Sequence, residues 1–264
     1  MNILFIGDIV GKVGRKALKK NLSFVKSKYN IDFVIANGEN ITNGRGINKT
    51  HYDFLLQCGV NCITLGNHYK DREEIVDYIS YSNEMIRPAN LLTDFPGEGS
   101  KEFLVKGKKI RVTNLLGQAF MNVQVKDPYL EIYKIIENDN SDIHIVDFHA
   151  EATGEKKAFA YSLGNKVSAV LGTHTHVQTR DAQILNTGIF YMSDVGMCGS
   201  YNSILGDEIN SVVNRIILHN EHSRFKLLED DDMLFNGVVL TFDDLTNKPI
   251  KIEPIYIINR KADN

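Results

Sequence analysis

Polar residues that can bind metal ions follow several short apolar segments of the sequence. They are Asp8, Glu39, Asn40, Asn67, His68, His149, His174 and His176. Carboxylate and amide oxygens combined with imidazole nitrogens suit manganese, iron or zinc. One tetrahedral ion cannot use so many ligands, whereas two ions that share a bridging carboxylate can. Two metal ions about 3.5–4 Å apart are suited to in-line displacement at phosphorus.

The intervals between these residues match strand–helix–strand units. Glu39 follows Asp8 by 31 residues, Asn67 follows Glu39 by 28, and His174 follows His149 by 25. One such unit takes about 30 residues. Successive members are therefore expected at the same end of successive parallel strands, where open α/β sheets bind ligands. Each Asp or Asn alone would be read as a turn residue, but their coincidence favours one shared site.

The elements that must position these residues can be read from the apolar pattern. Short segments rich in branched and aromatic residues predict buried strands at 3–6, 33–36, 62–65, 143–146, 167–171 and 189–192. Helical signals lie between or after them: apolar residues from Leu18 to Tyr29, a start at Thr50 with a stop at Gly59, a start at Asp127 before Pro128, and an apolar stripe from Ile209 to Ile217. His174 and His176 differ by two, so an extended segment would place both rings on one side.

Alternating strands and helices predict an α/β fold with a largely parallel central sheet. Because the candidate ligands extend from Asp8 to His176, they require a single sheet. The tail differs, because residues 237–242 and 251–258 read as an antiparallel hairpin. No linker or internal repeat interrupts the chain, so residues 1–264 are predicted to form one domain.

Composition excludes several classes of protein. The chain has 264 residues, 43% of them hydrophobic and 24% charged, which is typical of globular proteins. Its net charge of −3 gives no electrostatic reason to bind duplex nucleic acid or an anionic membrane. Three cysteines do not form a disulfide framework. With no basic leader and no apolar segment of about 18 residues, the expected location is cytoplasmic.

The glycine-rich segment from Gly7 to Gly14 is a rival candidate for binding a nucleotide. It follows a strand and precedes a helix, as a phosphate-binding loop would. Only three residues separate Gly7 from Gly11, however, and Val13 stands where a hydroxyl residue is required. The glycines are better explained by close passage of the backbone near the site and by the start of a helix. An enzyme that uses this loop would bind nucleoside triphosphate without a transition metal.

Seven segments together resemble the calcineurin-like metallophosphoesterases and, more narrowly, the bacterial YmdB-type phosphodiesterases. They are Gly-Asp-Ile-Val-Gly (7–11), Asn-Gly-Glu-Asn (37–40), Gly-Asn-His (66–68), Arg-Pro-Ala-Asn (87–90), Phe-His-Ala-Glu (148–151), Gly-Thr-His-Thr-His-Val-Gln-Thr (172–179) and Ser-Asp-Val-Gly-Met (193–197). The resemblance implies an α/β fold with a two-sheet sandwich flanked by helices. It also implies hydrolysis of phosphodiesters, including cyclic nucleotides. Val10 and Glu39 replace the His and the Asp of the wider superfamily, and both changes are typical of the narrower subgroup.

The resemblance also implies a role for each residue. One metal ion would be bound by Asp8, Glu39, Asn40 and His176, and the other by Glu39, Asn67, His149 and His174, with Glu39 bridging. The ions would be divalent or trivalent transition metals, with iron or manganese expected and zinc also compatible. A hydroxide that bridges the ions would attack phosphorus, and His68 would protonate the leaving group. Thr175, Gln178 and Asp147 are candidates for fixing the imidazole tautomers.

Other functions compatible with the same residues are a regulatory protein that binds metal and nucleotide with little turnover, and a phosphomonoesterase. The intact His68 favours an enzyme, because a pure binder does not need a general acid. The expected partner is a small phosphodiester or nucleotide substrate, without membrane or duplex nucleic acid. Assembly into a homo-oligomer is left open.

Overall fold

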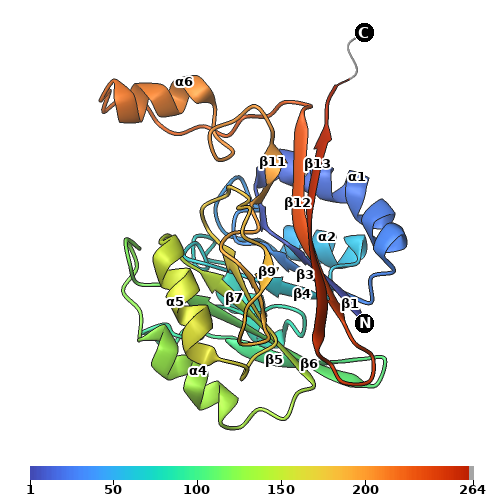
Figure 1. Ribbon diagram of the computed structural model, residues 1–264. Coiled ribbons are helices and arrows are strands. Elements are labelled where there is room, and N and C mark those ends of the chain that lie inside the picture. Colours follow the sequence, from blue (N-terminus) through green and yellow to red (C-terminus); the bar gives the residue numbers. More distant parts are fainter. Residues whose placement is uncertain (262–264) are drawn as a thin grey trace.

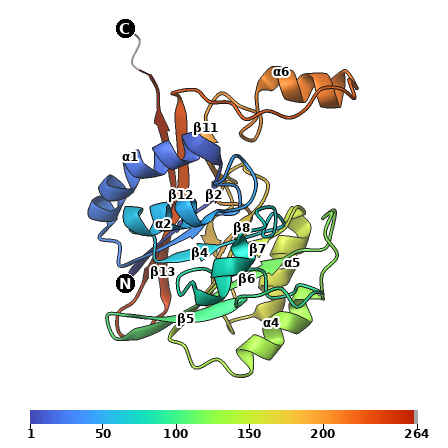
Figure 2. The same ribbon diagram turned by 180° about the vertical axis from the view of Figure 1, so that it is seen from behind.

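Two β-sheets pack face to face, and helices cover the outer face of each sheet (Figure 1). The computed structural model describes residues 1–261. An apolar core lies between the sheets, to which the first contributes Phe5 and Ile35 and the second contributes Ile145 and Leu171. Figure 2 shows the same layers from behind. The predicted α/β sandwich of two sheets flanked by helices is confirmed.

The first sheet has strand order β2-β11-β12-β1-β3-β4, with β13 also paired to β12. Its strands are β1 (Asn2–Ile6), β2 (Asp8–Ile9), β3 (Phe33–Asn37), β4 (Cys62–Thr64), β11 (Met197–Ser200), β12 (Met233–Phe242) and β13 (Pro249–Asn259). The strands β1, β3 and β4 are parallel. β12 and β13 form the antiparallel hairpin that was predicted for the tail.

The second sheet has strand order β5-β6-β7-β8-β10-β9. Its strands are β5 (Ser100–Val105), β6 (Lys108–Leu116), β7 (Ile143–His149), β8 (Ala169–Thr173), β9 (Gln183–Ile184) and β10 (Phe190–Met192). The four central strands β6, β7, β8 and β10 are parallel. The inference of a single sheet is therefore wrong. The residue spacing indicates only that neighbouring strands are parallel. Between Asn67 and His149 the chain crosses from the first sheet to the second.

Most of the helices lie where the sequence predicted a helix. They are α1 (Gly11–Tyr29), α2 (Lys49–Cys58), α3 (Ile75–Tyr78), α4 (Pro128–Ile136), α5 (Thr153–Leu163) and α6 (Ile209–Val212), with a 3₁₀ turn η1 (Ile79–Tyr81) and a π-helical turn η2 (Val213–Ile217). α1 and α2 pack on the first sheet, and α4 and α5 pack on the second. Asp127 caps α4 by accepting hydrogen bonds from the next turn, as predicted.

The start of α2 differs from its prediction by two residues. Its N-cap is Asn48, whose side chain accepts a hydrogen bond from the backbone N–H of His51. Thr50 instead lies inside the first turn. The predicted stop is confirmed, because Gly59 ends the helix with a left-handed φ of 93°.

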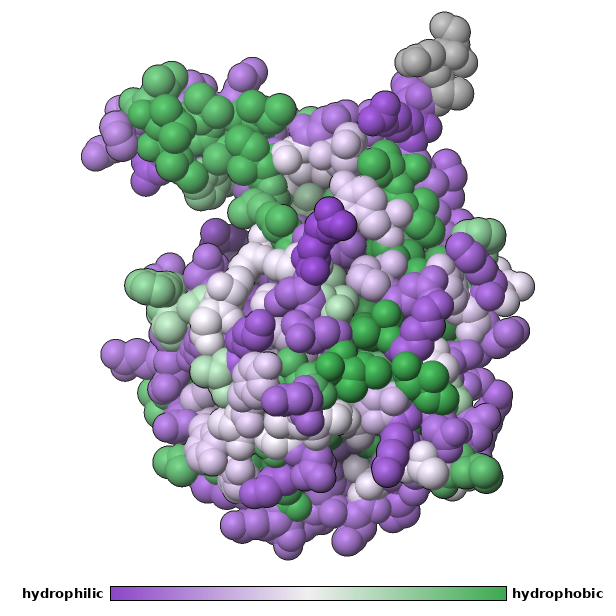
Figure 3. Space-filling view, viewed as in Figure 1, coloured by the Kyte–Doolittle hydropathy of each residue, from purple (hydrophilic) through white to green (hydrophobic). Residues whose placement is uncertain are grey.

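Residues 201–228, here called the arm, extend away from the two sheets (Figure 1). The arm carries α6 and η2, so the predicted helix is present. Its apolar stripe is not buried, because Ile209 is 50% exposed and Ile217 is 65% exposed, whereas Val212 is buried. Figure 3 shows this hydrophobic surface on the arm and the hollow between the arm and the sheets.

None of the helices within residues 1–261 is long and apolar enough to span a membrane. That residues 1–264 form one domain stays a prediction.

Candidate active site

The structure brings all the predicted site residues together at the ends of strands from both sheets. Asp8 begins β2, Glu39 and Asn40 follow β3, and Asn67 and His68 follow β4 in the first sheet; His149 ends β7, and His174 and His176 follow β8 in the second. The site therefore lies across the junction of the two sheets. Each sheet alone supplies only part of the donor set.

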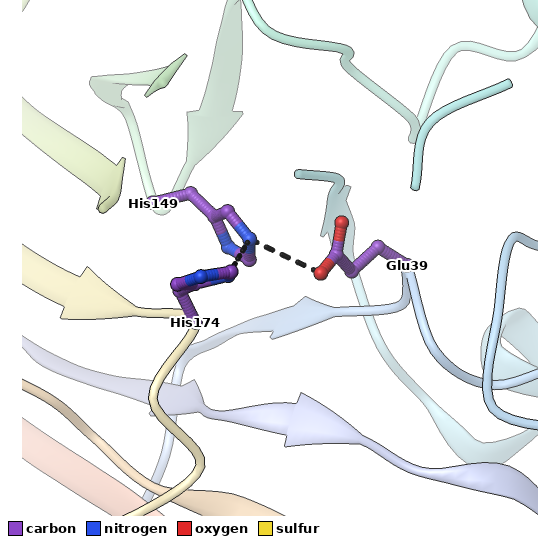
Figure 4. A group of neighbouring side chains, drawn as sticks. All are labelled: Glu39, His149 and His174. Atoms are coloured by element: carbon purple, nitrogen blue, oxygen red, sulfur yellow. Dashed lines mark hydrogen bonds and ion pairs between the residues drawn. The ribbon is translucent and has the colours of Figure 1, made fainter. Parts of the chain in front are cut away.

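The side chain of His149 is the centre of one group of donors. Its Nε2 lies 3.1 Å from Glu39 Oε1 and 3.1 Å from His174 Nδ1 (Figure 4). The same nitrogen lies 2.9 Å from Asn67 Oδ1. A single ring N–H cannot satisfy three such neighbours. Ligand atoms about 2.1 Å from a shared ion lie about 3.0–3.4 Å apart, which matches these separations. The donors of Glu39, His149 and His174 all lie within 4.8 Å of one another.

Asp8 and His176 form a second group next to the first. Asp8 is fully buried, and its Oδ1 has no hydrogen-bond partner in the part of the chain that is described. His176 Nε2 lies 3.9 Å from this oxygen and 3.2 Å from Asn40 Nδ2. A buried carboxylate oxygen without a partner is costly, and a cation would satisfy it. Ligation by Asn40 requires its amide to turn so that Oδ1 faces His176.

Each of the three imidazoles has one ring nitrogen held by an acceptor outside this group. His149 Nδ1 lies 2.9 Å from Thr173 Oγ1, His174 Nε2 lies 3.2 Å from Glu151 Oε2, and His176 Nδ1 lies 2.8 Å from Leu205 O. The other nitrogen of each ring faces the shared centre. This is the arrangement by which proteins orient histidines that bind a metal. The donor set therefore fits metal ions.

Buried charges dominate the electrostatics of the site. Burial raises the pKa of Asp8. Burial would also raise the pKa of Glu39, but the contact with His149 outweighs it and lowers that pKa to about 2. Burial acts to lower the pKa of His149, but Glu39 raises it to about 9. Burial and the neighbouring charge of His149 lower the pKa of His174 to about 3.

The residues expected to fix tautomers have different roles from one another. Asp147 acts through Thr173, whose hydroxyl donates to Asp147 Oδ1 at 2.7 Å. Because that hydroxyl has only one hydrogen, it must accept from His149 Nδ1. Gln178 donates instead to backbone carbonyls, including that of Ile255 at 3.0 Å, and none of these hydrogen bonds is to a site imidazole. Thr175 acts through its backbone N–H.

The His-x-His segment is not extended, contrary to its prediction. His174 and His176 have left-handed φ angles of 101° and 65°. Two buried carboxylates hold this turn: His174 N–H donates to Asp8 Oδ2 at 3.2 Å, and Thr175 N–H donates to Asp194 Oδ2 at 3.0 Å. Both rings reach the centre because the backbone turns.

His68 lies beside the donors with a side chain that is 24% exposed. Its Nδ1 donates to Asp71 Oδ2 at 2.8 Å, so Nε2 is the nitrogen available to a ligand. Its backbone N–H donates to Glu39 Oε2 at 2.9 Å, which ties His68 to the predicted bridging residue. Sequence reasoning missed Asp71; the signal was its position three residues after His68.

Close approaches of other atoms explain why two positions near the site are occupied by glycine. A Cβ on Gly66 would lie 2.3 Å from Glu39 Oε2 and 2.4 Å from His149 Nε2, so only glycine permits this approach. A Cβ on Gly7 would lie 1.8 Å from Gly196 O. The first glycine of the Gly7–Gly14 segment therefore packs against a neighbouring backbone.

The site opens into a cavity of about 870 Å³ between the sheets and the arm. Residues that line it include Glu39, His68 and His174 at the site, Arg45 beside it, and Arg224 and Phe225 on the arm. Sites for small molecules measure roughly 300–1,000 Å³. This cavity can hold a nucleotide-sized ligand.

The chain is similar in sequence and in structure to several known proteins. The model of a family described as YmdB-like protein matches residues 4–255. A 2′,3′-cyclic-nucleotide 2′-phosphodiesterase of Bacillus subtilis is 42% identical over 259 residues, which are 97% of this chain and 97% of that protein. The crystal structure of a phosphatase from Mycoplasma pneumoniae has a TM-score of 0.92 and 38% identity, and covers 98% of this chain and 93% of that one. A Thermus thermophilus structure also has a TM-score of 0.92, with 35% identity and coverage of 98% and 100%.

Proposed function

The chain belongs to the family of YmdB-like proteins, and on that premise we propose that it is a metal-dependent phosphodiesterase acting on cyclic nucleotides or other small phosphodiesters. The observation that carries the proposal is the orientation of His149, His174 and His176. Each has one nitrogen held outside the centre and the other directed into it. The unpartnered Oδ1 of Asp8 supports the same conclusion.

Two metal ions fit the donors. Asp8, Glu39, Asn40 and His176 would hold one ion, and Glu39, Asn67, His149 and His174 would hold the other. When bound, the ions supply hydroxide at neutral pH and neutralise charge that develops on the phosphoryl oxygens. The mixed oxygen and nitrogen donors favour iron or manganese, and zinc is compatible.

The side chains of the protein supply the remaining functions. His68 protonates the leaving oxygen of the substrate from Nε2, because Asp71 holds Nδ1 at 2.8 Å. The same hydrogen bond to the Asp71 carboxylate fixes the orientation of the imidazole ring. The residues that line the cavity orient the substrate. Arg45 contributes positive charge there, and Phe225 contributes an aromatic surface on which a base can stack.

The experiment is to remove the metal with a chelator and then to add manganese, iron or zinc separately. We expect the metal-free protein to lose hydrolysis of bis(p-nitrophenyl) phosphate and of 2′,3′-cyclic AMP, and one or more of the metals to restore it. Hydrolysis of p-nitrophenyl phosphate, measured in parallel, separates a diesterase from a monoesterase. Full turnover by the metal-free protein, or by a Glu39→Gln variant, would contradict the proposal.

A further inference from the structure

A lysine is completely buried close to the site. Lys156 lies in α5 and has no exposed side-chain surface, although lysine is almost never fully buried unless it is paired. Its Nζ donates to the backbone carbonyl of Thr173 and to Asp194 Oδ2, each at 2.9 Å. Neither acceptor belongs to α5. The ammonium group therefore connects this helix to the end of β8 and to the segment after β10.

The carboxylate of Asp194 continues this connection toward the predicted metal ligands. Asp194 is also fully buried, and its Oδ2 accepts the N–H of Thr175 at 3.0 Å. Its Oδ1 accepts the N–H of Gly196 at 2.8 Å. Thr175 is the residue between His174 and His176. Lys156 is thus linked through one carboxylate to the backbone that carries both imidazoles.

That backbone needs support from outside itself. Non-glycine residues in the left-handed region are strained and persist only where surrounding contacts hold them. His174 and His176 are both in this region. If Lys156 is removed, Asp194 becomes a buried carboxylate without its counter-ion. A buried charge that has lost its partner is strongly destabilising, so Asp194 would leave its position and weaken its hold on Thr175 N–H.

Lys156 also supports the third imidazole. It holds the carbonyl of Thr173, while the hydroxyl of the same residue accepts from His149 Nδ1. Lys156 does not line the cavity, so its contribution to the site passes through these neighbours.

We propose that Lys156 is a positioning residue: with Asp194 it fixes the backbone from Thr173 to His176 so that the imidazoles meet at metal-binding separation. The inference rests on the proposed function, because it assumes that the imidazoles bind metal. It assigns to a buried ion pair the role of setting metal affinity.

The test is the affinity of the chelator-treated protein for Mn²⁺, measured by the loss of the electron paramagnetic resonance signal of free Mn²⁺. Substitution of residues that orient metal ligands typically weakens affinity by about 10–100-fold. We expect a loss in this range for Lys156→Met, which keeps the unbranched shape without the charge. Lys156→Arg, which keeps the charge, is expected to retain more affinity than Lys156→Met.

A matched control separates positioning from general stability. Arg111 forms an ion pair with Asp139 at 2.8 Å, near the end of β6 that is remote from the site. Arg111→Met is expected to lower the melting temperature of the metal-free protein and to leave Mn²⁺ affinity unchanged. If Lys156→Met does not fold, Asp194→Asn replaces it, with the same expected loss of affinity.

Three results would overturn the inference. The first is equal Mn²⁺ affinity in the wild type and in the folded variant of the pair. The second is an equal loss of affinity in Arg111→Met, because that would reflect general destabilisation. The third is a wild-type protein that binds no Mn²⁺, iron or zinc, which would also remove the proposed function. In the first two results the wild type still binds metal, so the proposed function survives.

Discussion

At the scale of single residues, the site depends on which nitrogen of each imidazole is free. Thr173, Glu151 and Leu205 each occupy one nitrogen of a different predicted ligand, and Asp71 occupies one nitrogen of His68. The remaining nitrogens face the centre or are left for a ligand. Two histidines with different surroundings, His68 in the site and His51 outside it, lead to different predictions.

We expect His68→Ala to lose activity according to the leaving group. General acid catalysis contributes about 10²–10⁴-fold when the leaving oxygen is a poor leaving group. Hydrolysis of 2′,3′-cyclic AMP, which expels a ribose hydroxyl, should fall by this factor in kcat. Bis(p-nitrophenyl) phosphate expels the stable p-nitrophenolate and should lose much less. Equal losses for both substrates, with His219→Ala as the unaffected control, would contradict the assignment.

His51 is outside the site and should make stability depend on pH. Burial, followed by the charges of Arg15 and Arg72, lowers its pKa from 6.5 to about 4. The unfolded chain therefore binds a proton at higher pH than the folded protein does. The stability contributed by neutral His51 is present above about pH 6.5 and is lost as the pH falls toward 4. Because the ring is partly exposed to solvent, we expect this group to lower the free energy of unfolding by about 1 kcal/mol over that pH range.

The measurement is the free energy of unfolding by urea at pH 7 and at pH 4.5. His51→Gln should show a smaller decrease between these two values than the wild type does. The exposed His222 provides the control, since His222→Gln should follow the wild type. An unchanged decrease in His51→Gln would show that other groups cause it.

At the scale of elements, the sequence predicted best what depends on neighbouring residues. The strands that precede Asp8, Glu39 and Asn67, and the helix that follows Asp127, obey local rules of periodicity and capping. The turn at His174 could not be predicted from local rules, because the carboxylates that accept its backbone N–H groups are distant in sequence. The second sheet was missed by residue spacing for a related reason, since spacing describes neighbouring strands only. The resemblance supplied that sheet.

The start of α2 allows a direct test of local capping. Asn48 Oδ1 accepts the N–H of His51 at 2.9 Å, so Asn48→Ala should destabilise the protein by about 1 kcal/mol. Thr50, the N-cap expected from the sequence, makes no such bond, and Thr50→Ala should change stability little. Urea denaturation of both variants measures the difference. The reverse order would place the N-cap at Thr50.

Arg224 and Phe225 of the arm are expected to contribute to substrate binding and not to chemistry. Arg224 and Phe225 line the cavity from the arm. Stacking of a base on an aromatic side chain is worth about 1–3 kcal/mol. The double variant Arg224→Ala and Phe225→Ala should therefore raise KM for 2′,3′-cyclic AMP about tenfold or more, with little change in kcat.

Lys226 is the matched control for the arm. It is adjacent in sequence, pairs with Glu208 at 2.7 Å and does not line the cavity. Lys226→Ala should leave both constants near their wild-type values. A fall in kcat without a change in KM in the double variant would contradict a binding role.

At the scale of the whole molecule, the site joins the two sheets. The first sheet supplies mainly oxygen donors, from Asp8, Glu39, Asn40 and Asn67, and the second supplies the imidazoles of His149, His174 and His176. A metal ion bound between them adds contacts that hold one sheet to the other. Metal binding should therefore stabilise the fold as well as enable catalysis.

The size of this stabilisation follows from mass action. A ligand at 100 times its Kd that binds only the folded protein stabilises it by about 2.7 kcal/mol. For a chain of this length, each kcal/mol raises the melting temperature by about 2–4 °C. Mn²⁺ at that excess should thus raise the melting temperature of the chelator-treated protein by about 5–11 °C. Glu39→Gln should reduce the rise, because Glu39 is the predicted bridge, whereas Glu229→Gln should retain it. A melting temperature independent of Mn²⁺, iron and zinc would mean that no metal joins the sheets, because preferential binding to the folded state must appear as stability.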